Sequence, residues 1–141
     1  MSWQVRTFEQ AGDWQPVRDL WDRTGPGIQL SPSDEPAEIE KKLTRDPDLF
    51  LVAVADGRII GAVLGGFDGR RGMVYHLAVD PAERRRGVGK GLMEEMERRL
   101  RAKGCLKYYL LVTLENQQAM DFYQRLGWEP MKLRVMGKRI E

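Results

Sequence analysis

The chain has 141 residues, of which 42% are hydrophobic and 31% charged, and its formal net charge at neutral pH is +2. This length predicts a single domain over residues 1–141, and the composition is that of an ordinary globular protein. The near balance of charge gives no general attraction to nucleic acid, and the single cysteine, Cys105, excludes both an internal disulfide and a cysteine-based metal cluster. We therefore expect no metal site.

No hydrophobic run approaches the roughly 18 residues of a membrane span, and polar residues occupy the N-terminus where a signal peptide needs an apolar core, so we expect a cytoplasmic protein without a membrane partner.

The first 45 residues predict one strand and two helices. Residues 2–8 alternate between apolar and polar side chains, as a half-buried strand does. Asp13 is a candidate cap for a helix that runs to Gly25, and a stretch rich in Gly, Pro and Ser then leads to a second helix at about residues 33–45. Acidic residues early in this second helix could attract a cationic amine, although complementing the helix dipole is the simpler explanation for them. These residues are Asp34, Glu35 and Glu38.

Three consecutive strands are predicted to form an antiparallel meander. Residues 49–55 and 58–67 are rich in β-forming residues and are joined by Asp56-Gly57, a two-residue hairpin signal. Asp68-Gly69 marks the next hairpin, which leads into an apolar run over residues 73–79. Asp68 could be considered a catalytic carboxylate, but aspartate before glycine is far more often a turn residue.

A glycine-containing turn follows this third strand of the meander and precedes a long helix that ends at Lys103-Gly104. Its run Arg84-Arg85-Arg86-Gly87-Val88-Gly89 would bring backbone amides and the positive end of the helix dipole together, which suits a phosphate or pyrophosphate. A dinucleotide fingerprint would need glycine where Leu92 stands, and a P-loop would need glycine at Arg84 and Ser or Thr at Gly91. Neither nucleotide-binding motif fits.

The last 35 residues predict a strand, a short helix and closing strands. Residues 107–114 are expected to form the fifth strand, and Asn116 to cap a helix that carries Phe122 and Tyr123 and ends at Gly127. Trp128 and residues 131–140 would supply the closing strands. The expected fold is α/β (α+β), with a mixed, mostly antiparallel sheet of about seven strands and about four helices.

The glycine-containing turn and the segment around Asn116 and Tyr123 together resemble a known family. Residues 84–89 have the pattern R-x-x-G-x-G and follow a strand that ends in Ala-Val-Asp-Pro. A second segment follows at the right distance, with Asn116, Phe122-Tyr123 and Leu126-Gly127-Trp128. Together these motifs are similar to those of the GNAT superfamily of acetyl-coenzyme A-dependent N-acetyltransferases, and the chain resembles a small single-domain member of bacterial type. The resemblance covers nearly the whole chain. It implies a GNAT-like fold and transfer of an acetyl group from acetyl-coenzyme A (acetyl-CoA) to a primary amine by direct attack in a ternary complex.

The resemblance also implies which residues bind coenzyme A. Backbone amides of residues 85–90 would hold the pyrophosphate, and the fourth and fifth strands would splay apart so that an amide near residues 77–79 polarises the thioester carbonyl. The residues assigned in this way are Leu77, Ala78, Val79, Arg84, Arg85, Arg86, Gly87, Val88, Gly89, Lys90, Asn116, Ala119 and Tyr123.

The proton-transfer groups are less defined. Tyr123 matches the tyrosine that, in many relatives, protonates the departing thiolate, although it could also be only a core aromatic residue. Several relatives place a glutamate early on the fourth strand, where this chain has Met73. Tyr75 or His76 could serve as the general base, and as neighbours on a strand they are expected to point to opposite faces.

Other functions stay open at this level. A non-catalytic coenzyme-binding or regulatory module with the same fold is the main alternative, because the strand carboxylate is missing. A nucleic-acid-binding protein would depend on Arg84-Arg85-Arg86 alone. The acceptor, a small-molecule or peptide amine, cannot be identified from the sequence, and either a monomer or a homodimer is compatible with it.

Overall fold

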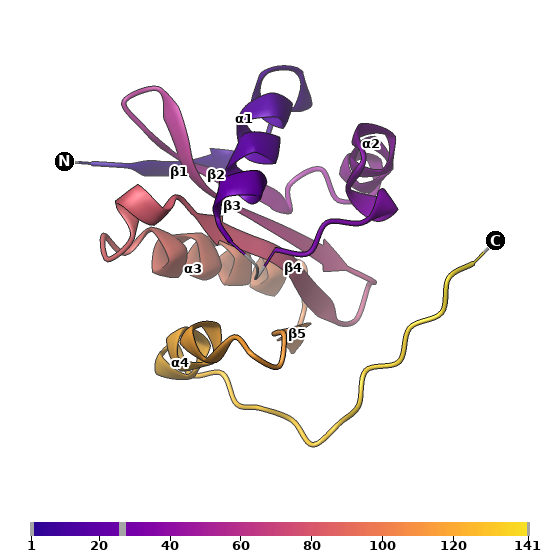
Figure 1. Ribbon diagram of the computed structural model, residues 1–141. Helices are drawn as coiled ribbons and strands as arrows, with labels where there is room; N and C mark the ends of the chain where they lie inside the picture. The colour runs from indigo at the N-terminus through magenta and orange to yellow at the C-terminus, as the bar shows by residue number, and fades with distance from the viewer. Residues whose placement is uncertain (1, 26–27, 141) are drawn as a thin grey trace.

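The computed structural model describes residues 2–25 and 28–140, and it places five strands and four α-helices there around one sheet (Figure 1). In this part of the chain no helix has the length and apolar character needed to cross a membrane. The strands are β1 (Gln4–Thr7), β2 (Phe50–Ala55), β3 (Arg58–Phe67), β4 (Gly72–Val79) and β5 (Tyr108–Leu110). The helices are α1 (Gln10–Arg23), α2 (Pro36–Arg45), α3 (Val88–Ala102) and α4 (Gln117–Arg125), with two short 3-10 helices, η1 (Pro32–Asp34) and η2 (Pro81–Glu83).

The sheet has the strand order β1-β2-β3-β4-β5, in which β1 to β4 are antiparallel and β5 runs parallel to β4. The Asp56-Gly57 hairpin forms as predicted, with φ values of 50° and 72° at the two residues, the left-handed geometry that such short hairpins need. The predicted meander of three strands is therefore confirmed.

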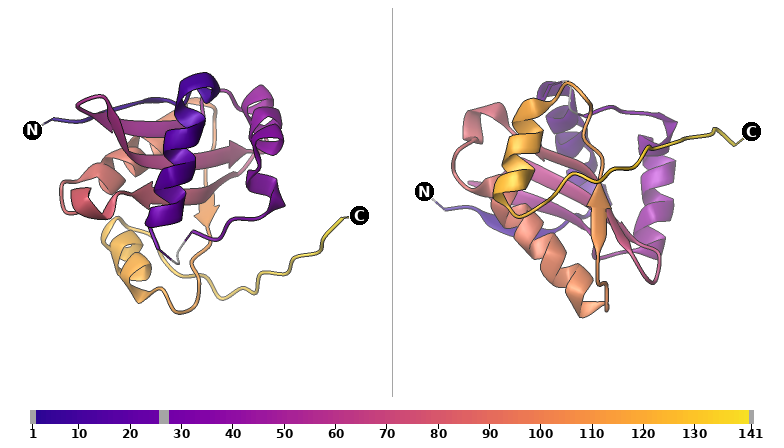
Figure 2. Two further views of the ribbon diagram at one scale, coloured as in Figure 1. Left: turned by 45° about the horizontal axis from the view of Figure 1, so that its top comes forward. Right: turned by 90° about the horizontal axis from the view of Figure 1, so that it is seen from below.

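Two layers of apolar side chains hold the helices on the sheet. One layer lies between the sheet and α3, and the other between the sheet and α1 with α2 (Figure 2). Strands β2 and β3 are buried on both faces, which explains why their sequences are almost continuously apolar. The side of α3 facing the sheet is formed by Val88, Leu92, Met93, Met96 and Leu100, the face expected from their spacing.

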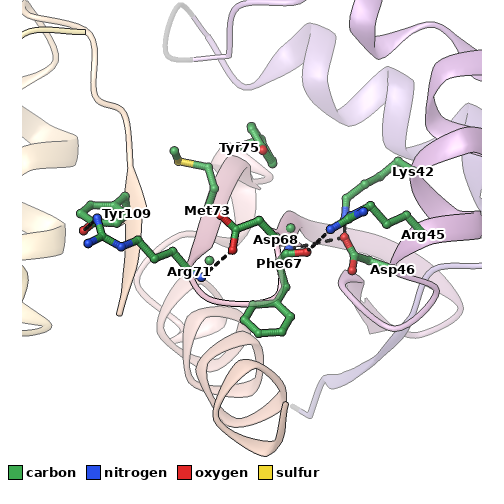
Figure 3. Close-up of a pocket in the computed structure, with 11 residues that line it drawn as sticks. Lys42, Arg45, Asp46, Phe67, Asp68, Arg71, Met73, Tyr75 and Tyr109 are labelled. Carbon is green, nitrogen blue, oxygen red and sulfur yellow. Dashed lines mark hydrogen bonds and ion pairs between the residues drawn. The ribbon is translucent and has the colours of Figure 1, made fainter. Parts of the chain in front are cut away.

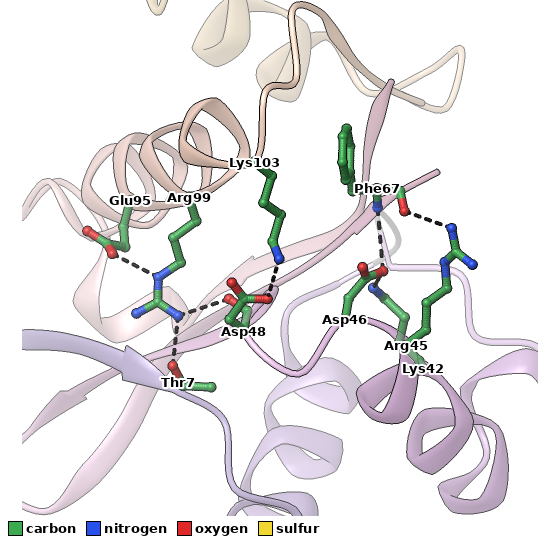
Figure 4. Close-up of polar contacts among 9 residues, drawn as sticks. All are labelled: Thr7, Lys42, Arg45, Asp46, Asp48, Phe67, Glu95, Arg99 and Lys103. Atoms are coloured by element: carbon green, nitrogen blue, oxygen red, sulfur yellow. Dashed lines mark hydrogen bonds and ion pairs between the residues drawn. The ribbon is translucent and has the colours of Figure 1, made fainter. Parts of the chain in front are cut away.

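Polar contacts also connect α3 with β1, the edge strand of the sheet, and with the turn before β2. The guanidinium of Arg99 donates to the hydroxyl of Thr7 at 2.7 Å and to the carbonyl oxygen of Asp48 at 2.9 Å, while Glu95 accepts from it at 2.8 Å (Figure 4). This single side chain therefore links α3 to β1 and to the start of β2.

The pairing of β3 with β4 contains a β-bulge. Leu64 lies opposite His76, but Gly65 lies opposite Val74, so Tyr75 is one residue in excess on β4. The bulge resets the alternation of side chains. Val74 packs in the layer under α3, whereas Tyr75 and His76 both lie on the face covered by α1 and α2. The expectation that Tyr75 and His76 point to opposite faces is therefore wrong.

Four boundaries differ from the sequence-based expectation. Helix α1 begins at Gln10, so Asp13 lies in its first turn and is not its cap. Strand β5 comprises three residues rather than residues 107–114, and η1 occupies the beginning of the predicted second helix, so that α2 starts at Pro36. Residues 129–140 form no strand and are exposed along their whole length, so the sheet has five strands rather than about seven. The apolar residues of this segment alternate as a strand would, but it runs away from the body (Figure 1) and finds no sheet edge within the described chain. The expected number of helices is confirmed.

Candidate active site

The site begins at Asp80, where β4 ends. The amide of Asp80 donates to the carbonyl oxygen of Ile60 at 2.8 Å, and its carboxylate accepts from the amide of Ala82 and from Arg23 of α1, both at 3.0 Å. Burial raises the pKa of Asp80, but the bonds from Ala82 and Arg23 outweigh this and hold the pKa below its usual value. The end of β4 is thus fixed to β3 and α1, and the chain enters η2 in a defined direction.

The turn after η2 has two residues in the left-handed region, Arg85 with φ 68° and Gly87 with φ 78°. No atom lies within 4 Å of the position where a side chain at Gly87 would begin, so the space in front of this residue is open. Val88 then starts α3, and the amides of its first turn have no partner inside the helix. This arrangement of free amides and helix dipole suits an anionic group, as the sequence predicted.

Gly89 has a different role, because a side chain there would meet other parts of the protein. Its Cβ would lie 3.1 Å from Cζ of Phe122 and 3.6 Å from Cγ2 of Val79. Glycine at this position allows α4 and β4 to pack directly on the first turn of α3.

The basic side chains of the turn divide into two pairs. Arg84 donates to the carbonyl oxygen of Thr24 at 3.2 Å, and the largely buried guanidinium of Arg86 pairs with Glu83. Arg85 and Lys90 are exposed and have no hydrogen bond or ion pair with the residues described. The first pair therefore builds the turn, and the second is available to a ligand.

Strands β4 and β5 separate beside the turn. Their pairing ends at Val74 and Leu110, so residues 75–79 have no partner strand on that edge within the described chain. The amide of Asp80 donates toward β3, and backbone groups alternate between the two edges of a strand. The amides of Leu77 and Val79 therefore face the open edge, whereas Ala78 faces β3 and buries its side chain on the α1 face.

Helix α4 borders the same region. Asn116 caps it as predicted, since its side-chain oxygen accepts from the amide of Ala119 at 3.1 Å. The ring centroid of Tyr123 lies 5.1 Å from the ring centroid of Phe122 and 5.9 Å from the ring centroid of Trp128. Burial raises the pKa of Tyr123 to about 12, so the phenol keeps its proton at neutral pH.

On the other face of β4, His76 pairs with a residue 42 positions away in the chain. Its Nε2 lies 2.8 Å from Oδ1 of Asp34, and the two side chains are only 12% and 10% exposed. Asp34 belongs to η1 and not to α2, so its predicted place within the second helix is wrong. Sequence reasoning considered both residues but missed their pairing, because the bulge at Tyr75 turns His76 to this face.

A hollow of about 460 Å³ lies near the far end of β4, among α2, the β3–β4 hairpin and β5 (Figure 3). Tyr75 and Met73 line it from β4, and no pattern in the sequence predicted this hollow. At the wall of this hollow, Nζ of Lys42 lies 2.5 Å from Oδ2 of Asp46. The pKa of Lys42 is lowered, because the effect of burial is larger than the opposite effect of the Asp46 carboxylate. Asp68 accepts from the amides of Arg70 and Arg71, both at 2.7 Å, and this supports the turn role expected for it.

Comparison with known proteins agrees with this architecture. Residues 14–128 match the acetyltransferase (GNAT) family. The chain is 41% identical over 138 residues to acetyltransferase ECA0875 of Pectobacterium atrosepticum, covering 97% of this chain and 95% of that protein.

Solved structures have the same fold. PaiA N-acetyltransferase from Thermoplasma acidophilum, in complex with coenzyme A, superposes with a TM-score of 0.79 at 22% identity, over 95% of this chain and 94% of that one. AAC(6')-Iy, in complex with a CoA-S-monomethyl-acetylneamine bisubstrate analogue, gives a TM-score of 0.77 at 24% identity, over 100% and 99% of the two chains.

The strand, turn and helix thus define an acyltransferase fold with an open strand edge beside the turn. The chain belongs to the GNAT acetyltransferase family, and it is an acetyltransferase. The resemblance inferred from the sequence and the expected fold class are confirmed, apart from the strand count.

Proposed function

We propose that this protein transfers the acetyl group of acetyl-CoA to the primary amine of a small molecule or a peptide, in a ternary complex. The observation that carries the proposal is the edge of β4 at residues 75–79 that has no partner strand among the described residues, next to the left-handed turn that opens α3. The coenzyme A in the PaiA structure and the bisubstrate analogue in AAC(6')-Iy, both on this fold, support it.

The coenzyme would lie along the open edge. Its pyrophosphate accepts hydrogen bonds from the amides of residues 85–90, and Arg85 and Lys90 add charge attraction. Its thioester carbonyl accepts from the amide of Leu77 or Val79. A donor directed at the developing oxyanion contributes about 3 kcal/mol to the transition state.

The reaction then needs two proton transfers. The neutral amine nitrogen attacks the carbonyl carbon, an N–C bond forms, and the C–S bond breaks as the tetrahedral intermediate collapses. The proton lost by the nitrogen goes to His76, and the thiolate takes a proton from Tyr123, which regains one from solvent. Tyr75 is less available as a base than His76, because desolvation and the nearby Asp46 raise the pKa of its phenol, which therefore stays protonated at neutral pH.

Titration calorimetry with acetyl-CoA, with coenzyme A and ATP as comparisons, tests the coenzyme site. We expect micromolar binding of both coenzymes and a weak response to ATP. Gly87→Glu, which places bulk and negative charge in the open space before α3, should abolish binding in a folded protein. The matched control is Gly104→Glu at the other end of α3, where φ is 88° and the space is also open.

A thiol-release assay with a panel of peptide and small-molecule amines tests the transfer itself. Release above the rate without amine supports the proposal. Coenzyme binding without turnover of any amine would instead favour a non-catalytic coenzyme-binding module.

A further inference from the structure

We propose that Asp34 is a positioning residue for acetyl transfer, which fixes the imidazole of His76 and holds residues 28–35 against β4. This inference rests on the proposed function. It starts from the contact between Asp34 and His76, which joins the connection between α1 and α2 to the strand that would carry the thioester.

Both carboxylate oxygens of Asp34 are in use. Oδ1 lies 2.8 Å from Nε2 of His76, and Oδ2 accepts from the amide of Ser31 at 3.0 Å. The hydroxyl of Ser31 in turn accepts from the amide of Ser33 at 3.3 Å. One side chain therefore organises its own loop and binds the sheet at the same time.

The contact between Asp34 and His76 is also the main polar attachment of the loop formed by residues 28–35. Among the residues that the structure describes, it is the one side-chain hydrogen bond from residues 28–35 to the sheet. The other attachment is apolar, through Ile28 and Leu30, which pack against the layer under α1. Without Asp34, we expect the loop to lose its alignment over His76 while α1 and α2 remain in place.

The same contact determines which nitrogen of His76 can act. A neutral imidazole that donates from Nε2 to a carboxylate has its lone pair on Nδ1, the arrangement in which a carboxylate orients a general base. Nδ1 has no hydrogen-bond partner among the described residues, and the ring of Trp21 packs edge-on against the imidazole at 5.1 Å. Asp34 and Trp21 together hold the ring in one orientation.

The substitution Asp34→Asn separates the two tasks of the carboxylate. An asparagine has one acceptor oxygen, and its NH2 group can only donate. If the oxygen keeps the amide of Ser31, the NH2 group donates to Nε2 of His76, which places the imidazole proton on Nδ1 and removes the lone pair that would act as base. With an amine found in the thiol-release screen, we expect kcat to fall at least tenfold and the KM for the amine to rise several-fold, while the KM for acetyl-CoA stays within twofold. The control is Asp19→Asn, an exposed aspartate of α1, which should change neither constant.

A double substitution shows whether Asp34 acts through His76. In a His76→Ala background, Asp34→Asn should have little further effect on kcat. Equal effects in the two backgrounds, or an unchanged kcat in Asp34→Asn, would overturn the positioning role.

Hydrogen exchange of the Ser31 and Asp34 amides in the protein without substrates gives a readout independent of turnover. Asp34→Ala removes both acceptor oxygens, so we expect these amides to exchange faster in this variant than in the control Asp19→Ala. Unchanged exchange would refute the attachment of the loop even if turnover fell. If no amine is acetylated, the proposed function and the positioning role both fail, and faster exchange would then support only a structural contact.

Discussion

Gly89 and Phe122 lie so close together that a Cβ atom added at Gly89 would be only 3.1 Å from Cζ of the phenylalanine ring. The first turn of α3 and the middle of α4 are therefore packed against each other without a gap. This contact links the proposed phosphate site to the helix that carries Tyr123.

We predict that Gly89→Val displaces α4 and weakens coenzyme binding at least tenfold in titration calorimetry. Overpacking of this kind costs about 1–3 kcal/mol, so the melting temperature should also fall. Phe122→Leu in the same chain removes part of the clash and should restore part of the affinity. Equal affinity of Gly89→Val with and without Phe122→Leu would show that the loss comes from another contact.

The four basic residues of the turn should separate into two classes. Replacing Arg85 and Lys90 by alanine should weaken coenzyme binding, increasingly so at low salt where charge attraction is strongest, and leave the melting temperature unchanged. Replacing Arg86 should instead lower the melting temperature, because Glu83 is then left nearly buried without this partner. Thermal unfolding and calorimetry on the same samples distinguish the classes, and a reversed pattern would contradict the assignment.

Tyr123→Phe should lower kcat about 100-fold or more if the phenol protonates the thiolate. The hydroxyl has no hydrogen bond within the described chain, so the melting temperature should not fall. Because burial raises the pKa of Tyr123 to about 12, the kcat of the unsubstituted enzyme should not decline through this group at pH 8–10. A kcat within threefold of the unsubstituted enzyme would assign Tyr123 to packing alone.

Asp13 should make stability depend on acid pH. The hydrogen bond from Arg6 lowers the pKa of Asp13 below 3.8, and the amide of Glu9 adds to this. A carboxylate with a lowered pKa in the folded state stabilises the protein above its unfolded pKa, and this contribution is lost as the pH falls through the folded pKa.

Asp13→Asn should therefore lower the melting temperature at pH 7 and narrow the difference between the two proteins below about pH 4. Asp22→Asn, whose ion pair with Arg18 is exposed, serves as the control and should have little effect. An unchanged difference across the whole pH range would argue against the Arg6 contact.

The parts of the fold that sequence reasoning predicted well are those set by neighbouring residues. Asp56-Gly57 specifies its hairpin through local dihedral preferences, Asn116 caps its helix, and the apolar spacing of α3 defines its buried face. The turn at Gly87 belongs to the same group, because glycine there meets a conformational requirement that is visible in the motif itself.

What could not be predicted depends on residues far apart in the chain. The bulge at Tyr75 arises from the pairing of two strands, and alternation within β4 alone gives the wrong face for one of its two polar side chains. The contact between Asp34 and His76 depends on that bulge. The alternating residues 131–140 satisfy the local criteria for a strand, but a strand also requires a partner edge, which no local pattern can supply.

The bulge has a wider consequence for how this enzyme could diversify. Under the proposed function, the coenzyme would lie along the open backbone edge of β4, and the acceptor would meet the face that carries Tyr75 and His76. The neighbours of these two side chains include α2 and the connection between α1 and α2. Substitutions in those two segments can therefore alter the choice of amine without disturbing the seat of the acetyl donor. If the proposed sites are correct, the one extra residue of the bulge allows donor binding and acceptor choice to change independently.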